Sequence, residues 1–265
     1  MATNLATAQR VSANFSADPA NAGSYSQFSR GLVDMDLQAV ELPFVNIRTM
    51  TPPSALDREG FILAHHDVTG DWSSQAWLDE VYVPSCLDLV QRLTHASAVF
   101  NLYFPIIRSV NNRDGEAVPA AFLHIDQTRV GYREQAQVLA QAHGREYKGG
   151  AVYNVWKAVS PPPQDQTLAF LDQRHIDPAD LVLGMNVEQG GSGGAPFYGI
   201  APPRVPQPIH GVPDLTARES LVFLAVNMDD DKPLGVAHTS IAPPPSDQAP
   251  NPRQSVELRV LALFD

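Results

Sequence analysis

Short apolar runs, several of which alternate with polar residues, recur along most of this chain and are separated by turns rich in proline and glycine. The clearest alternation spans residues 255–261, where Ser, Glu and Arg alternate with Val, Leu and Val. Successive side chains of a strand point to opposite faces, so this period indicates a strand with one polar and one apolar face. On these criteria we predict strands over residues 98–107, 118–125, 151–159, 167–171, 181–185, 220–226, 236–241 and 255–264.

Segments with few helix breakers predict helices over residues 75–81, 84–95 and 132–143. Asp71 or Ser73 can cap the first of them. Pro84 suits the first turn of the second, and Gly144 can end the third. Two of the three helices precede most of the strands. We therefore expect a mainly β chain, either a sandwich or a barrel, with helices that buttress one face of a sheet.

Weak periodicity and many Ala, Ser and Asn residues indicate a loosely packed N-terminal arm over residues 1–30. We expect residues 31–265 to form a single domain. The glycine-rich segment 188–194 lacks the Lys and Ser/Thr of a phosphate-binding loop and predicts a flexible lid or a solvent loop. The proline-rich segments 201–213 and 243–252 predict stiff connections that can form the rim of a pocket.

The candidate chemistry begins with His124 and Asp126, which stand two residues apart after an apolar run. Such a pair projects from one face of a strand, and a distant histidine, His238, can complete a set of two imidazoles and one carboxylate. A set of this kind on one side of an iron(II) ion leaves positions open for a co-substrate and dioxygen. Arg253 follows on the next predicted strand and has the forked geometry that grips a carboxylate.

His-x-Asp alone is a weak signal, because the chain contains a second copy, His65-His66-Asp67, which we interpret as a decoy. A zinc hydrolase can use the same three ligands, although it has no need of the arginine. The single cysteine, Cys86, excludes an internal disulfide and a thiolate-rich metal site, and a half-buried thiol on a helix is the simpler interpretation.

Composition narrows the possible partners. The chain has 265 residues, 44% of them hydrophobic, and a formal net charge of −11 with no block of Lys or Arg. Nucleic acids and anionic membranes are therefore poor partners, since both require a basic patch. We find no secretory signal and no apolar run of the roughly 20 residues needed to span a bilayer, so we expect a cytoplasmic protein. The oligomeric state stays open.

From about residue 55 to its end, the chain resembles a family of iron(II)/2-oxoglutarate oxygenases. The family contains the cephalosporin methoxylation subunit CmcJ, gibberellin desaturase-like proteins and fungal AsaB-type hydroxylase/desaturases. The more specific matches are Asn-Val-Trp-Lys at 154–157 and Arg-x-Ser-x-Glu-x-Arg at 253–259. The proline-rich segment 198–213 and Val226–Asp229 depart from the family's pattern. Both departures concern the substrate side.

The resemblance implies a double-stranded β-helix (jelly-roll or cupin-like) core that binds iron(II), 2-oxoglutarate and dioxygen. His124, Asp126 and His238 would hold the metal. Arg253, assisted by Ser255, would bind the distal carboxylate of 2-oxoglutarate. Arg259 is a rival for that role, because the two arginines share one face of the predicted strand.

Five more residues complete the candidate site. Asn154 and Trp156 share one face of a predicted strand and are candidates to contact the co-substrate. Tyr103, Arg108 and Tyr153 are candidates to line the substrate pocket. Core packing of the indole and a surface salt bridge of Arg108 are the simpler alternatives.

The resemblance further implies hydroxylation, desaturation or oxidative cyclisation of a small molecule in secondary or amino-acid metabolism. A non-catalytic jelly-roll protein that binds a small molecule is the alternative.

Overall fold

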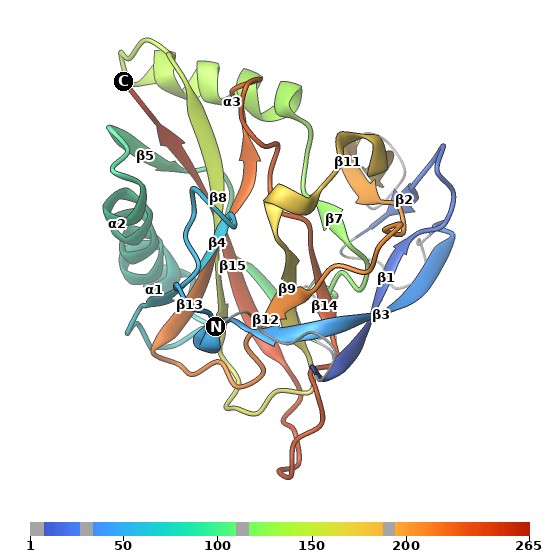
Figure 1. Ribbon diagram of the computed structural model, residues 1–265. Helices are drawn as coiled ribbons and strands as arrows, with labels where there is room; N and C mark the ends of the chain where they lie inside the picture. Colours follow the sequence, from blue (N-terminus) through green and yellow to red (C-terminus); the bar gives the residue numbers. More distant parts are fainter. Residues whose placement is uncertain (1–7, 27–33, 110–116, 188–193) are drawn as a thin grey trace.

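A computed structural model describes residues 8–26, 34–109, 117–187 and 194–265. Two β-sheets face each other, and a helical segment covers the outer side of one of them (Figure 1). The expectation of a mainly β fold with helices against one sheet is confirmed. Across these ranges, no helix combines the length and apolar character needed to cross a bilayer.

The larger sheet has nine strands within the described residues. From one edge to the other, they are β1 (Arg10–Ser16), β3 (Leu37–Asn46), β12 (Ile209–Gly211), β9 (Thr167–Leu171), β14 (His238–Ile241), β7 (His124–Ile125), β11 (Gly194–Ile200), β10 (Leu181–Val187) and β2 (Gly23–Tyr25). The pairings are antiparallel except for β3 with β12 and β2 with β10. The two short strands β7 and β14 therefore lie in the interior of this sheet.

The second sheet contains the long central strands. Its order is β4 (Phe61–His65), β13 (Glu219–Asn227), β8 (Gly150–Ala158), β15 (Gln254–Leu263) and β5 (Ala98–Asn101), and β6 (Ile106–Ser109) also pairs with β15. All of these pairings are antiparallel. Both faces of β8 are buried, which requires cover on both sides of the sheet.

The cover on the outer side is one continuous helical segment. It runs from α1 (Gln75–Trp77) through a π-helical turn (Leu78–Tyr82) into α2 (Val83–Thr94). The predicted pair of helices is thus a single segment, capped by Ser74 instead of Asp71 or Ser73. Pro84 lies in the first turn of α2, as predicted. The third predicted helix is α3 (Arg129–Ala142), which begins three residues earlier than expected.

The space between the sheets is filled from both sides. Phe61 and Phe223 of one sheet contact Phe170 of the other, with ring centroids 5.0 Å apart in each pair. On the outer face of β15, its apolar residues pack against α2 in the same buried cluster. The polar residues of β15 therefore point between the sheets. This arrangement places polar side chains inside an otherwise apolar core.

The N-terminal residues correct one expectation. β1 pairs along its whole length with β3, and Phe15 is completely buried. β2 adds to the other edge of the same sheet. The prediction of a loosely packed arm is therefore wrong for residues 10–25. Alternation over Val11, Ala13 and Phe15 is the signal that identifies β1, although it is short and its intervening residues are small.

Two predicted strands are also revised. The segment 98–107 is divided into β5 and β6, because Pro105 cannot donate to a ladder. In the segment 118–125 only His124 and Ile125 are paired as a strand. The strands β3, β4, β11 and β12 were not predicted. The predicted lid at residues 188–194 lies outside the described residues except for Gly194, which begins β11.

Candidate active site

The two candidate histidines face each other across a pair of interior strands. His124 is the first residue of β7 and His238 the first of β14, and the two are register partners. Their ring centroids are 4.4 Å apart. Asp126 follows β7 directly and projects to the same side as His124, as expected for residues two apart. His124 and His238, 114 positions apart in the chain, are thus brought together by sheet pairing.

The ligand atoms of this trio converge. The Nε2 atoms of His124 and His238 lie 3.8 and 3.9 Å from Oδ1 of Asp126, and one ligand atom from each residue falls within 4.8 Å of the others. Both Nδ1 atoms face backbone carbonyls, that of Phe122 at 2.9 Å and that of Val236 at 3.2 Å. These contacts fix the rings and direct each Nε2 toward the shared space.

Electrostatics favours the protonation states that a metal requires. Burial, assisted by the neighbouring His238, lowers the pKa of His124 to about 3, so its imidazole is neutral at pH 7. Burial alone would raise the pKa of Asp126, but the Arg259 guanidinium, the two histidines and the Asn154 amide together outweigh it and hold that pKa below its ordinary value. The donor set is therefore two imidazoles and one carboxylate. This set fits an iron(II) ion with open coordination positions.

Both oxygens of Asp126 are held by neighbouring strands. Asn154 Nδ2 on β8 donates to Oδ2 at 2.7 Å, and Arg259 Nη2 on β15 donates to Oδ1 at 2.7 Å. Asn154 is completely buried, and the side chain of Asp126 is 5% exposed. The carboxylate therefore has a fixed orientation, with Oδ1 as the oxygen that faces the histidines.

Arg253 is buried beside the two histidines. It is 1% exposed, and its Nη1 donates to Ser240 Oγ at 3.0 Å. Its Cζ lies 5.6 Å from the ring centroid of Trp156. Within the described parts of the chain, Arg253 forms no ion pair with a carboxylate, and its Nε has no hydrogen-bond partner. Burial and the nearby Arg108 lower its pKa to about 9, which still leaves the guanidinium charged at pH 7.

A buried cation without a carboxylate is costly and marks an anion site. Ser255, the second candidate on this face of β15, adds a buried hydroxyl whose oxygen has no hydrogen-bond partner in the described part of the chain. Ser240, in turn, donates to Gln166 Oε1 at 2.6 Å. The groups that can receive an anion are thus concentrated on one side of the histidines.

Two adjoining cavities of about 20 Å³ each flank His124, and both are lined by Arg108, Ala120 and His124. The first is completed by Trp156, Leu168, His238, Ser240, Arg253 and Glu257. The second is completed by Tyr25, Phe122, Asp126, Asn186, Phe197 and Arg259. The first is cationic near Arg253, whereas the second has aromatic walls. The first cavity therefore suits a small anion, and the second suits an apolar group.

The two rival arginines have different surroundings. Arg259 is bound to Asp126 and lies 3.3 Å from Glu257 Oε1, whereas Arg253 faces the first cavity. Arg108 lines both cavities, donates to the Val118 carbonyl at 2.9 Å and pairs with Glu257 Oε2 at 3.5 Å. The surface salt bridge considered for Arg108 is therefore a buried one.

The remaining candidate residues differ in whether they point between the sheets. Asn154 and Trp156 point between the sheets, as their alternation predicts. Tyr153 has the opposite orientation on β8 and lines neither cavity, so the structure does not bring it to the other candidates. Tyr103 lines neither cavity. Its ring lies 6.0 Å from Arg259 Cζ, and its hydroxyl donates to Gln135 at 2.8 Å.

The decoy motif is structural. His66 is buried, and its ring nitrogens contact the hydroxyls of Ser220 at 2.9 Å and Ser85 at 3.2 Å. His65 is exposed, and Asp67 pairs with Arg218 on the surface. No other cluster of metal-ligating residues is found in the described residues besides His124, Asp126 and His238.

Several residues of the site were not predicted, namely Ser240, Glu257, Tyr25, Phe122, Asn186 and Phe197. For Glu257 and Ser240 a signal exists, because each lies two residues from a predicted one on the same strand face. Tyr25, Asn186 and Phe197 come from strands at the far edge of the larger sheet, and their approach depends on tertiary pairing that carries no local signal.

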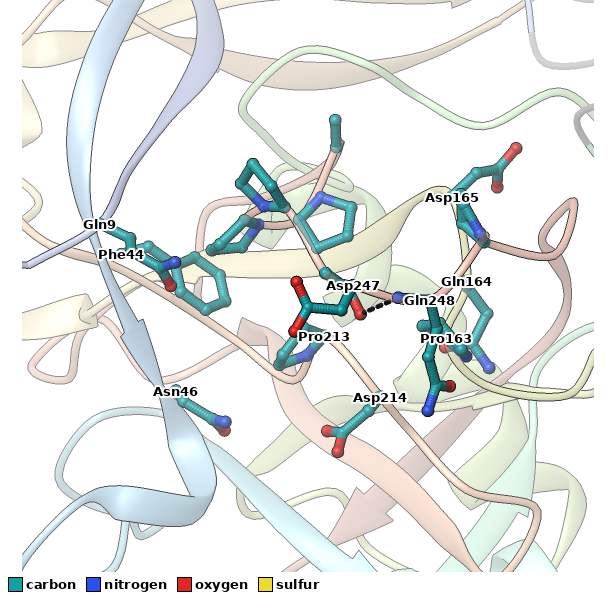
Figure 2. Close-up of a pocket in the computed structure, with 16 residues that line it drawn as sticks. Gln9, Phe44, Asn46, Pro163, Gln164, Asp165, Pro213, Asp214, Asp247 and Gln248 are labelled. Atoms are coloured by element: carbon teal, nitrogen blue, oxygen red, sulfur yellow. Dashed lines mark hydrogen bonds between the residues drawn. The ribbon is translucent and has the colours of Figure 1, made fainter.

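A wide surface groove lies elsewhere. It has a volume of about 730 Å³ and is formed by Phe44, the loop 163–165, Pro213 and Asp214, and the proline-rich loop 242–250 (Figure 2). None of the candidate site residues lines it. The predicted rim-forming role of the loop 243–252 therefore concerns this outer groove and not the cavities beside His124.

Fold and site together define a mainly β jelly-roll protein with a candidate His-Asp-His metal centre. Residues 13–263 match the YDMC family, described as an oxidoreductase/YMDC permease-like domain, so the chain belongs to that family. No curated protein matches the sequence significantly.

Solved structures with a similar fold include the iron and alpha-ketoglutarate-dependent endoperoxidase NvfI, with a TM-score of 0.79 at 19% identity. A second conformation of that enzyme gives 0.80 at 20% identity. Both comparisons cover 97% of this chain and 98% of the other. This fold confirms the expected jelly-roll core, and the family match, described as an oxidoreductase domain, agrees with the resemblance inferred from the sequence.

Proposed function

We propose that this protein is a non-haem iron(II)/2-oxoglutarate-dependent oxygenase, formed by a single domain, that oxidises a small molecule. The observation that carries the proposal is the buried guanidinium of Arg253, which lies beside a converging His-Asp-His set and pairs with no carboxylate among the described residues. A metal hydrolase does not need such a cation, whereas a site for a dicarboxylate co-substrate does. The fold of NvfI, whose name gives iron and alpha-ketoglutarate as its requirements, supports the same conclusion.

Each residue has a role in this proposal. His124, Asp126 and His238 bind iron(II) through Nε2, Oδ1 and Nε2. Arg253 binds the distal carboxylate of 2-oxoglutarate in the first cavity, and the Ser255 hydroxyl accepts or donates a hydrogen bond there. Trp156 stacks on the guanidinium and limits its movement. Asn154 orients Asp126.

Bound iron(II) and 2-oxoglutarate would supply the oxidation, in which dioxygen is consumed and 2-oxoglutarate becomes succinate and carbon dioxide. In hydroxylation, one oxygen atom enters a substrate C–H bond and the other enters succinate. In desaturation or ring closure, the substrate loses two hydrogens and the second oxygen atom leaves as water. The protein contributes binding, orientation and exclusion of water from the buried site.

The substrate is proposed to enter the second cavity. Its aromatic walls are close-packed, with the Tyr25 and Phe122 centroids 5.1 Å apart and those of Phe122 and Phe197 5.7 Å apart. Asn186 and Arg108 supply the polar groups. A substrate with an apolar body and one polar end suits this lining. Both cavities are small, so side chains of the rim must move to admit ligands.

Anaerobic titration with iron(II) and 2-oxoglutarate tests the proposal. We expect a weak visible charge-transfer band in the wild type and its loss in His124→Ala and His238→Ala. The matched control is His65→Ala, which removes an exposed histidine of the decoy motif and should leave the band unchanged. Succinate release under air gives a second readout.

Three results would contradict the proposal. One is succinate release retained in full by His124→Ala. The second is activity with zinc and no oxygen uptake, which would indicate a hydrolase. The third is ligand-induced thermal stabilisation with no metal dependence, which would indicate a binding protein.

A further inference from the structure

Arg259 and a metal ion would use the same carboxylate oxygen. Oδ1 of Asp126 lies 3.8 and 3.9 Å from the two histidine Nε2 atoms, and Arg259 Nη2 donates to that oxygen at 2.7 Å. The other oxygen, Oδ2, is held by Asn154. The positively charged group of Arg259 is therefore placed at the oxygen that is directed toward the metal position.

A second carboxylate draws Arg259 in another direction. Glu257 Oε1 lies 3.3 Å from the same Nη2, yet it is buried and has no hydrogen-bond partner among the described residues. Its other oxygen, Oε2, pairs with Arg108 at 3.5 Å. Arg259 Nε is also buried, and no described residue forms a hydrogen bond with it. Oε1 of Glu257 is therefore available to form a closer ion pair with the Arg259 guanidinium.

We infer that Arg259 is a positioning residue that weakens metal binding at Asp126, and that Glu257 limits this effect by sharing the guanidinium. The inference rests on the proposed function, because it assumes that His124, Asp126 and His238 bind a divalent cation. The guanidinium withdraws electron density from Oδ1 and repels a dication at close range, and both effects reduce affinity. A shift of the Arg259 side chain toward Glu257 reduces both the electron withdrawal and the repulsion.

This role differs from simple orientation of the carboxylate. If Arg259 only oriented Asp126, its removal would weaken metal binding, as loss of supporting hydrogen bonds generally does. If it competes for Oδ1, its removal strengthens binding, because Asn154 still holds Oδ2. The two roles thus predict opposite signs. Arg259 lies outside the co-substrate cavity lined by Arg253, so the effect should appear without 2-oxoglutarate.

The test is the affinity for Mn(II), whose free-ion EPR signal disappears on binding, measured at pH 7.5 without co-substrate. We expect Arg259→Gln to bind Mn(II) at least tenfold more tightly than the wild type. Arg259→Lys, which keeps the charge, should bind Mn(II) with an affinity close to that of the wild type. Glu257→Gln should bind several-fold more weakly. The double variant should resemble Arg259→Gln, because Glu257 acts through Arg259.

Arg92→Gln is the matched control, since it removes the same charge from an exposed arginine on α2. Weaker binding by Arg259→Gln, with recovery in Arg259→Lys, would overturn the inference and leave orientation as the role. Equal affinities of wild type and Arg259→Gln would also overturn it. Failure of the proposed function has a different result: the wild type would bind Mn(II) no better than His124→Ala. Thermal unfolding confirms that each variant is folded.

Discussion

The guanidinium of Arg253 stacks on the indole of Trp156, with Cζ 5.6 Å from the ring centroid. Both side chains are buried between the two sheets, Trp156 on β8 and Arg253 directly before the neighbouring strand β15. The indole face attracts the cation and restricts its rotation, while Ser240 accepts one of its hydrogens. The fork of Arg253 is therefore held ready for an anion before that anion arrives.

The first prediction concerns Arg253→Lys. Lysine keeps the charge but loses the two parallel donors, and a charge-assisted hydrogen bond contributes about 1.5–3 kcal/mol. We expect the affinity for 2-oxoglutarate to fall roughly 10- to 100-fold, measured from the charge-transfer titration. Arg253→Gln should lose more of the affinity for 2-oxoglutarate, because the charge is also removed.

Stability is the control for this pair. A buried charge without a partner destabilises the fold, so its neutral replacement should be neutral or stabilising. We expect the thermal midpoint of Arg253→Gln to equal or exceed that of the wild type. A large decrease in the midpoint would identify Arg253 as a structural residue and remove the main support for an anion site.

The second prediction concerns Asn154, whose amide donates to Oδ2 of Asp126 at 2.7 Å. Asn154→Leu preserves the approximate size but removes the donor. Partners of this kind typically change metal affinity by roughly 10- to 100-fold, so we expect weaker Mn(II) binding by about tenfold. Unchanged affinity in a folded variant would show that Arg259 alone orients the carboxylate.

The candidate site was predicted best where two residues share a strand face. His124 with Asp126, and Asn154 with Trp156, follow from a period of two. The contact between Arg259 and Asp126 joins residues 133 positions apart, and no local pattern indicates it. The ion pairs of Glu257 with Arg108 and Arg259 likewise depend on the packing of the strands and carry no local signal.

The third prediction is a pH dependence of stability caused by His66. Burial, assisted by Lys157, lowers its pKa to about 4 in the folded protein. An unfolded histidine binds a proton near pH 6.5, so between about 6.5 and 4 the unfolded chain binds more protons than the folded one. The free energy of unfolding therefore falls as the pH drops through this window. The contribution is at most roughly 3 kcal/mol.

Urea unfolding of His66→Gln and the wild type at pH 7.5, 5.5 and 4.5 measures this effect. Glutamine does not titrate and can still contact the hydroxyls of Ser220 and Ser85. We expect the wild type to lose more stability than the variant on acidification, whereas the exposed control His65→Gln should follow the wild type. A pH-independent difference between wild type and His66→Gln would refute the assignment.

The fold was predicted best in its central strands. β9 has the predicted bounds. The bounds of β8, β13 and β15 each differ from the predicted ones by one residue at both ends. These strands are long or apolar enough for their period to dominate. The strands β1, β3 and β12 are short or contain polar residues, and they are stabilised by pairing within the larger sheet. That pairing is non-local, so propensity alone does not reveal it.

The last prediction tests whether the N-terminal strand belongs to the fold. Phe15 on β1 is completely buried and packs with Leu42 and Ile125, the latter adjacent to both His124 and Asp126. Truncation of a buried phenylalanine to alanine costs about 3–5 kcal/mol, so Phe15→Ala should lower the free energy of unfolding by that amount in urea denaturation. Ser12→Ala, an exposed change on the same strand, should alter it by less than about 0.5 kcal/mol. Because β7 is only two residues long and relies on its surroundings, Phe15→Ala should also weaken Mn(II) binding. A Phe15→Ala protein as stable as Ser12→Ala would restore the loosely packed arm that the composition and weak periodicity of residues 1–30 indicate.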